Sequence, residues 1–188
     1  MKKIMFDDKF GLTQAVLEGR KTMTRRVAKK GARKYGLCFD IHGDIYYPQY
    51  VIGERVAIAQ RYSEVMQYIT HTFPRLNRYT IEGSAGYNNK MFVDSLLMPH
   101  HILITNVEIQ RLNDISHTDC LREGITTITE GKQEVGNGFG WDTKIAAVER
   151  DTFFSPRRAF AHLIEKMMGK GTWVSNPLVF VYEFKLID

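Results

Sequence analysis

The chain has 188 residues, of which 44% are hydrophobic and 25% are charged, and its formal net charge at pH 7 is +5. This length supplies one substantial hydrophobic core and argues against a second full domain, and the ordinary composition excludes an intrinsically disordered chain. We therefore expect a single domain that spans residues 1–188.

The first predicted element is a short helix over residues 10–18, which ends at Gly19. A basic segment follows, with eight basic residues and no acidic ones from Arg20 to Lys34, so the rest of the chain carries a small net negative charge. Such a local excess indicates either an anionic partner at one place or a solvated face, and charge alone does not choose between them. Three glycines favour a loop over residues 28–43.

In the middle of the chain, two predicted strands flank a region whose sequence has no clear secondary-structure pattern. A turn at Gly53 precedes a strand that begins at Arg55, and strict alternation of side chains predicts a longer strand over residues 101–112. Residues 62–97 mix aromatic and polar side chains with two glycines. We expect mostly irregular structure there, with one helix over residues 63–71.

The last third of the chain predicts two helices and a final strand. Ser116 and Asp119 resemble a capping box at the start of a helix over residues 117–122, and four glycines within residues 131–140 favour a mobile loop. Ser155 and Pro156 are typical of a helix start, and alternation over residues 178–187 predicts a strand. Strands separated by short helices, without regular βαβ units, indicate an α+β barrel-type fold rather than a doubly wound sheet.

Four blocks of the sequence, in order along the chain, resemble segments of the ASCH family. Residues Gly19 to Arg26 resemble its GxKxxTxR signature, and the segment from Met98 to Ser116 is similar to its second block. Residues Asp119 to Ile125 contain the EGI element, and Trp173 to Pro177 with the following strand resemble the closing segment of phage and prophage ASCH proteins. The resemblance implies a PUA-like β-barrel with short flanking helices and an insertion over residues 62–97.

The resemblance further implies a basic cleft that binds RNA or a nucleotide- or nucleobase-like ligand. Cationic side chains in and after the signature block are the candidates for contacts with phosphate. These residues are Arg20, Arg25, Arg26, Lys29 and Lys30.

An alternative function comes from the small bacterial ASCH proteins, which are acetylcytidine amidohydrolases. Their catalytic residues map to Lys21, Thr24 and Glu123. In such a site Lys21 would serve as the base for the Thr24 hydroxyl if burial and the neighbouring arginines lower its pKa, and Glu123 would orient the lysine or carry a proton. A structural reading stays open, in which Lys21 and Glu123 form an ion pair and Thr24 stabilises a turn.

The chain departs from the family pattern at two places that we expect to change the cleft. After the Gly53–Glu54 turn the strand lacks the Trp and the acidic residue that many members carry, and His100 stands where many members have Arg. The spacing between Lys21 and Thr24 leaves their relation open as well: the two side chains share a face if the segment is helical, but if it is extended they point to opposite faces and their pairing then needs a turn.

We expect no cofactor and no metal site. The neighbouring His100 and His101 face opposite sides of a strand, and Cys38 and Cys120 form no CxxC motif. No secretory leader and no apolar run of about 20 residues is present, so we expect no membrane partner and a cytoplasmic location with reduced thiols. The expected partners are RNA or a modified nucleoside.

Overall fold

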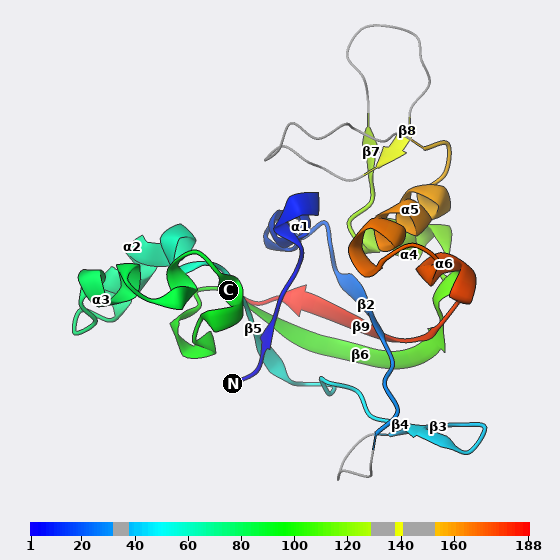
Figure 1. The fold of residues 1–188 in the computed structure, drawn as a ribbon, viewed down its shortest axis with the longest axis horizontal. Helices are drawn as coiled ribbons and strands as arrows, with labels where there is room; N and C mark the ends of the chain where they lie inside the picture. Colours follow the sequence, from blue (N-terminus) through cyan, green and yellow to red (C-terminus); the bar gives the residue numbers. More distant parts are fainter. Residues whose placement is uncertain (32–37, 129–137, 141–152) are drawn as a thin grey trace, which may run out of the picture.

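The structure, a computed structural model, describes residues 1–31, 38–128, 138–140 and 153–188. Its framework is a five-stranded mixed sheet in the order β1-β5-β6-β9-β2 (Figure 1). These strands are β1 (Lys3–Ile4), β2 (Met23–Val27), β5 (Arg55–Ile58), β6 (His101–Arg111) and β9 (Leu178–Leu186). Among the described pairs of this sheet, β1 and β5 run parallel and the other pairs run antiparallel.

The two longest strands, β6 and β9, form the centre of the sheet. They pair antiparallel from Ile102 opposite Leu186 to Arg111 opposite Leu178, and the register shifts between Ile104 and Asn106. Such a bulge bends and twists the strand that carries it. The β9 residues 179–182 are all buried, so both faces of the sheet are covered at its centre.

Helices cover one face of the sheet and a hairpin covers the other (Figure 1). The helical face carries α1 (Leu12–Leu17), α4 (His117–Arg122) and α5 (Pro156–Met168). On the opposite face lies the hairpin of β3 (Phe39–Ile41) and β4 (Asp44–Tyr46), where Phe39 contacts Phe180 and Tyr50 contacts Tyr182 edge to face. The remaining short elements are η1 (Asp8–Phe10), η5 (Leu112–Asp114), α6 (Thr172–Ser175) and the hairpin of β7 (Thr126–Ile128) with β8 (Gly138–Gly140).

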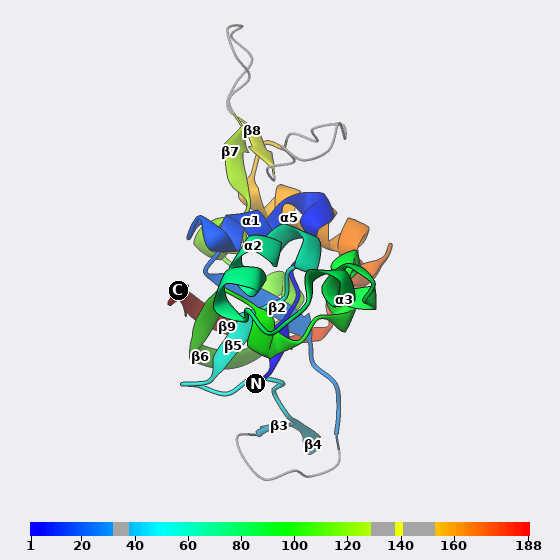
Figure 2. The same cartoon turned by 90° about the vertical axis from the view of Figure 1, so that its left-hand side faces the viewer.

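The expected insertion over residues 62–97 is a separate group of short helices at one end of the sheet (Figures 1 and 2). It contains α2 (Tyr62–Thr72), α3 (Arg78–Glu82), η2 (Ala85–Tyr87), η3 (Lys90–Phe92) and η4 (Ser95–Leu97). Its apolar side chains form a small core of their own around Ile69, which packs against Ala57 and Ala59 of the β5 region. The region is therefore more helical than its sequence indicated.

The α+β class is confirmed, and the predicted helices and strands outside the glycine-rich regions are present. The loop predictions for residues 28–43 and 131–140 were wrong in part, because Phe39–Ile41 and Gly138–Gly140 are strands. Residues 131–137 of the second loop lie outside the described residues. Among the described strands, β1 and β2 are edges and the sheet does not close into a barrel. Within the same residues, no helix is both long enough and apolar enough to span a membrane.

Candidate functional site

The signature block reaches the centre of the molecule through a turn after α1 and the short strand β2. Gly19 has φ +72°, and the Lys21 backbone N–H donates to the Ala15 carbonyl at 2.9 Å, which closes the turn. The Thr22 backbone N–H donates to the carbonyl of Arg122 at 2.9 Å and so ties the start of β2 to the end of α4. The segment from Met23 onward is extended, whereas Lys21 lies in the turn before the strand, so that Lys21 and Thr24 both line the same pocket.

Glu123 is brought to the same place by the end of α4. Ser116 caps this helix by accepting from the Asp119 N–H at 3.0 Å. The chain then turns at Gly124, which has φ +101° and where a Cβ atom would lie 3.2 Å from the Leu12 side chain. The EGI element thus needs glycine for its backbone conformation, and the turn places the Glu123 side chain beside Lys21.

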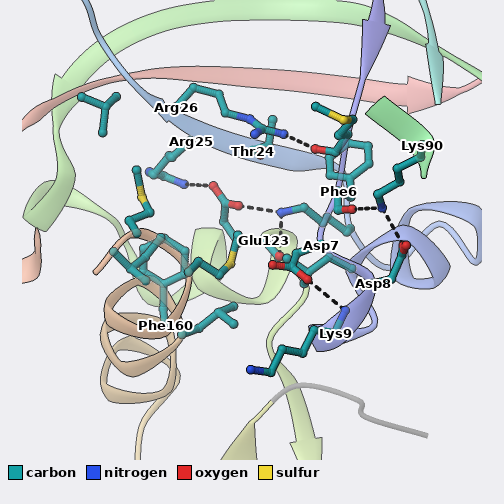
Figure 3. A pocket seen from close by; sticks show the side chains of 18 of the residues that line it. Phe6, Asp7, Asp8, Lys9, Thr24, Arg25, Arg26, Lys90, Glu123 and Phe160 are labelled. Carbon is teal, nitrogen blue, oxygen red and sulfur yellow. Dashed lines mark hydrogen bonds and ion pairs between the residues drawn. The ribbon is translucent and has the colours of Figure 1, made fainter. Parts of the chain in front are cut away.

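Three buried charges, those of Lys21, Arg25 and Glu123, form one cluster at this point, and Figure 3 labels Arg25 and Glu123. The Lys21 ammonium donates to both Glu123 Oε2 and the Glu123 carbonyl at 2.7 Å, and Arg25 Nη1 donates to Glu123 Oε1 at 3.0 Å. Only 2%, 5% and 1% of the side chains of Lys21, Glu123 and Arg25 is exposed. Removing one partner of such a buried cluster would leave an unmatched charge away from water.

Arg25 is also held by two further side chains. Its Nη2 lies 3.3 Å from Asp119 Oδ2. When the Gln110 amide is oriented with its oxygen toward Arg25, that oxygen accepts from Arg25 Nη2 at 2.8 Å and from Nε at 3.1 Å. Arg25 therefore fixes β2 against α4 and β6, and its charge is matched inside the protein.

Burial lowers the pKa of the Lys21 ammonium below its usual range, and the nearby Arg26 and Arg25 act in the same direction. The Glu123 carboxylate opposes this shift through its charge and its hydrogen bond, but burial is the largest effect. A lysine in this environment loses its proton more readily than one in water, which is the property a lysine base needs.

A pocket of about 550 Å³ opens beside the cluster. One wall comes from α5 and is apolar, while the other carries charged side chains from the N-terminal segment, β2 with the turn before it, η3 and the Glu123 turn (Figure 3). The apolar wall consists of Phe160, Leu163, Ile164, Met167 and Met168. The charged wall includes Asp7, Asp8, Lys9, Lys21, Arg25, Arg26, Lys90 and Glu123.

Thr24 and Arg26 line the pocket but take no part in the cluster of buried charges. No described residue forms a hydrogen bond with the Thr24 hydroxyl, although Thr24 is buried. Arg26 Nη2 donates to the Met5 carbonyl at 2.6 Å, and the Arg26 guanidinium lies 6.0 Å from the centre of the Phe6 ring. Within the described chain, Arg26 has no carboxylate partner, so its charge is available to a ligand.

The structure thus brings five of the predicted residues to one pocket: Lys21, Thr24, Arg25, Arg26 and Glu123. The other three do not line it. Arg20 pairs with Glu18 at 2.6 Å, Lys30 pairs with Asp44 at 2.7 Å, and Lys29 is exposed. Arg33 and Lys34 lie outside the described residues.

Three of the pocket residues that could not be predicted from the sequence are Phe6, Asp8 and Lys90. Phe6 is buried, and its ring lies 5.8 Å from the Lys21 ammonium. Phe6 and Asp8 precede the first recognisable motif, and Lys90 lies in the part of the insertion where no periodic pattern exists. No signal in a single sequence connects positions 6 and 90.

His100 and His101, which the sequence analysis did not expect to share a metal ion, both contact Asp188. In the part of the chain that the structure describes, no group of three or more His, Cys, Asp or Glu side chains is placed to hold a metal ion.

Comparison of the chain with protein-family models, curated proteins and solved structures finds no match. The function is therefore argued from the pocket itself.

Proposed function

We propose that the chain is an ASCH-type protein of the PUA-like group and that its pocket binds one nucleobase-like ligand. The observation that carries the proposal is the meeting of five signature-block and EGI residues in one pocket of about 550 Å³, opposite an apolar helix wall. Small-molecule sites are mostly apolar clefts of about 300–1,000 Å³ with a few placed polar groups. A heterocycle has apolar faces and a polar edge, which matches these two walls.

Matched charges favour a single base over a long nucleic-acid backbone as the ligand. Of the predicted phosphate contacts, Arg25 is buried in the cluster, and Arg20 and Lys30 have carboxylate partners. A protein that follows a polynucleotide backbone presents a row of unmatched cations. We therefore propose a nucleoside, a nucleotide or an unpaired base of RNA, with Arg26 next to its phosphate or sugar.

Calorimetric titration tests this function with cytidine, adenosine, their 5′-monophosphates and a paired RNA duplex. The proposal expects saturable binding of at least one nucleoside or nucleotide at one site, and weaker binding of the duplex. Arg26→Gln should weaken nucleotide binding by about tenfold, and Lys29→Gln, an exposed residue away from the pocket, is the matched control. Absence of binding across the panel, or equal effects of the two variants, would overturn the proposal.

Catalysis by the same pocket is the second candidate, and the environment of Lys21 favours it. Burial lowers the pKa of Lys21, and Lys21, Thr24 and Glu123 line the same pocket. Neutral Lys21 would take the proton of the Thr24 hydroxyl as its oxygen attacks the carbonyl carbon of an acylated base. The amide C–N bond would then break, the base amine would leave with the proton returned by Lys21, and water would hydrolyse the acyl ester of Thr24.

Release of acetate from acetylcytidine tests this second candidate. We expect turnover that is lost in Thr24→Val and partly retained in Thr24→Ser, because serine keeps the hydroxyl. Binding of acetylcytidine without any release of acetate would leave the pocket as a binding site and remove the amidohydrolase.

A further inference from the structure

We infer that residues 89–91 of the insertion are the specificity wall of the pocket and that Lys90 is the positioning residue that holds this wall; the inference rests on the proposed function. The insertion joins the chain at residues 62–97, far from the signature block in sequence, yet Asn89, Lys90 and Met91 line the pocket. These three residues belong neither to the signature block nor to the EGI element.

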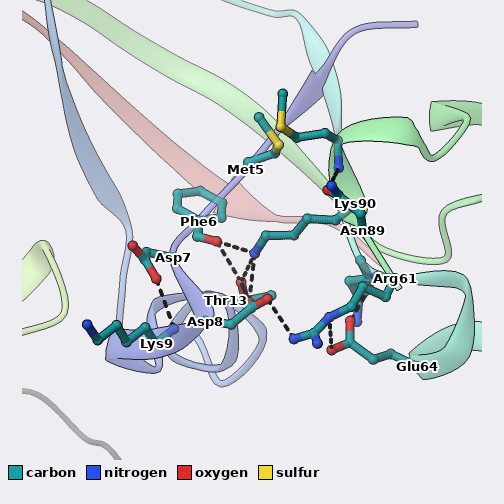
Figure 4. A network of polar contacts seen from close by, with 12 residues as sticks. Met5, Phe6, Asp7, Asp8, Lys9, Thr13, Arg61, Glu64, Asn89 and Lys90 are labelled. Carbon is teal, nitrogen blue, oxygen red and sulfur yellow. Dashed lines mark hydrogen bonds and ion pairs between the residues drawn. The ribbon is translucent and has the colours of Figure 1, made fainter. Parts of the chain in front are cut away.

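The Lys90 side chain donates hydrogen bonds to three acceptors between residues 6 and 13 (Figure 4). Its ammonium donates to the Phe6 carbonyl, to Asp8 Oδ1 at 2.7 Å and to the Thr13 hydroxyl at 3.3 Å. We call this group of four residues the Lys90 clamp. Only 16% of the Lys90 side chain is exposed, so these contacts are partly shielded from water and from salt.

The other members of the clamp are themselves fixed. The Thr13 hydroxyl donates to Asp8 Oδ1 at 2.5 Å, and Arg61, which precedes α2, lies 3.2 Å from Asp8 Oδ2. Asp8 thus pairs with one cation that precedes the insertion, Arg61, and with one inside it, Lys90. Burial alone would raise the pKa of Asp8, but its hydrogen bonds with Lys90 and Thr13 and the charges of Lys90 and Arg61 lower it overall.

The clamp is connected to the chemistry of the pocket through Phe6. The Phe6 carbonyl accepts from Lys90, while the Phe6 ring lies 5.8 Å from the Lys21 ammonium and 6.0 Å from the Arg26 guanidinium. The same ammonium holds η3, whose Met91 is largely exposed at the pocket rim. Lys90 therefore sets both the position of the Phe6 ring and the distance of the 89–91 wall from the ligand.

A wall held in this way limits the size of the substituent that a bound base can carry. Loss of Lys90 should release residues 89–91 and allow bulkier ligands to bind. If Lys90 had only a structural role, its loss would lower the affinity for all ligands by the same factor. The informative quantity is therefore the ratio of two affinities rather than either affinity alone.

The test compares the parent protein with Lys90→Met and with Arg78→Met. Arg78 lies in the same insertion, but it is exposed and pairs only with Glu82 among the described residues, so it is the matched control. The ligands are acetylcytidine and benzoylcytidine, and hydrogen exchange of the amides of residues 89–92 reports on the wall without any ligand.

We expect Lys90→Met to shift the affinity ratio toward benzoylcytidine by about fivefold or more and to speed exchange of the wall amides by about tenfold, with Arg78→Met unchanged. Faster exchange with an unchanged ratio would overturn the specificity role, and unchanged exchange would overturn the clamp. If the parent protein binds neither acylated cytidine, the specificity role is overturned; the proposed function is decided separately by the panel of nucleosides and nucleotides, and the clamp is decided by the exchange result.

Discussion

Lys21 and Glu123 are separated by 102 positions in the chain, and the Lys21 ammonium lies 2.7 Å from a carboxylate oxygen of Glu123 in the interior of the protein. The same carboxylate binds Arg25 through its second oxygen. This pair joins the signature block to the EGI turn, and both the pocket and the stability of its charged wall depend on it.

Glu123→Gln should destabilise the fold by roughly 3–5 kcal/mol, because it leaves Lys21 unmatched and Arg25 with only Asp119 as an acidic partner in the described chain. Urea denaturation measures the change in the free energy of unfolding. Adding Lys21→Met should cost less than the sum of the two single changes, since the second removes the charge that the first orphaned. The exposed pair of Arg78 and Glu82 is the control, and Glu82→Gln should change stability by less than about 0.5 kcal/mol. Equal effects of Glu123→Gln and Glu82→Gln would contradict a buried cluster.

The neighbouring arginines Arg25 and Arg26 should behave in opposite ways. Arg25→Met removes the partner of Glu123, Asp119 and Gln110, so we expect a loss of roughly 3 kcal/mol or more in stability. Arg26→Met removes a side chain that has no carboxylate partner among the described residues, so stability should change by about 1 kcal/mol or less. Ligand binding should fall in Arg26→Met even though the protein stays folded. Thermal denaturation and titration of both variants decide this, and the reverse assignment would show that the cluster is misplaced.

Thr24→Val tests the hydroxyl rather than the fold. Valine has nearly the same shape, and no described residue hydrogen-bonds the Thr24 hydroxyl, so stability should change by about 1 kcal/mol or less. Binding or turnover should nevertheless decrease, and Thr24→Ser should restore part of it. Unchanged affinity and turnover in Thr24→Val would mean that the ligand does not use this hydroxyl.

Asp8 should make stability depend on pH in the acid range. Its pKa in the folded protein is lowered from 3.8, chiefly by Lys90 and Thr13 acting against burial, so the ionised form stabilises the folded state. This contribution is complete above the unfolded pKa of 3.8 and disappears as the pH falls through the lowered pKa. Urea denaturation at a series of pH values should show a stability difference between the parent and Asp8→Asn that shrinks toward low pH. A difference that stays constant with pH would contradict the Lys90 clamp.

The two cysteines provide a simple chemical check on the packing of α4. Cys120 is fully buried, and burial raises the pKa of its thiol to about 12, whereas Cys38 is exposed. Iodoacetamide at mildly alkaline pH should therefore alkylate Cys38 in the native protein and both thiols in urea, as mass spectrometry of peptides will show. Rapid native labelling of Cys120 would place α4 in a looser packing than the one described.

Periodic segments and strong caps could be predicted from the sequence, while contacts between distant segments could not. The alternation in β6 and β9 and the Ser155–Pro156 helix start are local signals, and each gave the right element. The resemblance to the ASCH family led to Lys21, Thr24 and Glu123, which line one pocket. The geometry of that pocket was open, because the same spacing fits either a helix or a strand.

The Lys90 clamp shows what a single sequence leaves out. Lys90 lies in a segment of short 3-10 turns that has no repeating pattern, and its partners Phe6 and Asp8 belong to no motif. Their contact depends on where the packing of the insertion, with its own core around Ile69, places η3 relative to the N-terminal segment. The charges of Arg20, Arg25 and Lys30 made the basic segment look like one surface, but their partners Glu18, Glu123 and Asp44 come from separate parts of the chain.

Methionine-methyl NMR tests the central claim most directly, because four of the eight methionines line the pocket: Met5, Met91, Met167 and Met168. Met66 and Met98 belong to the core of the insertion and serve as internal controls. Titration of the methyl-labelled protein with cytidine, adenosine and their 5′-monophosphates should, for at least one of these ligands, shift the four pocket methyl signals together along one saturable curve and leave Met66 and Met98 in place. Pocket signals that move with none of these ligands, or shifts confined to Met66 and Met98, would contradict a nucleobase site between Lys21, Glu123 and α5.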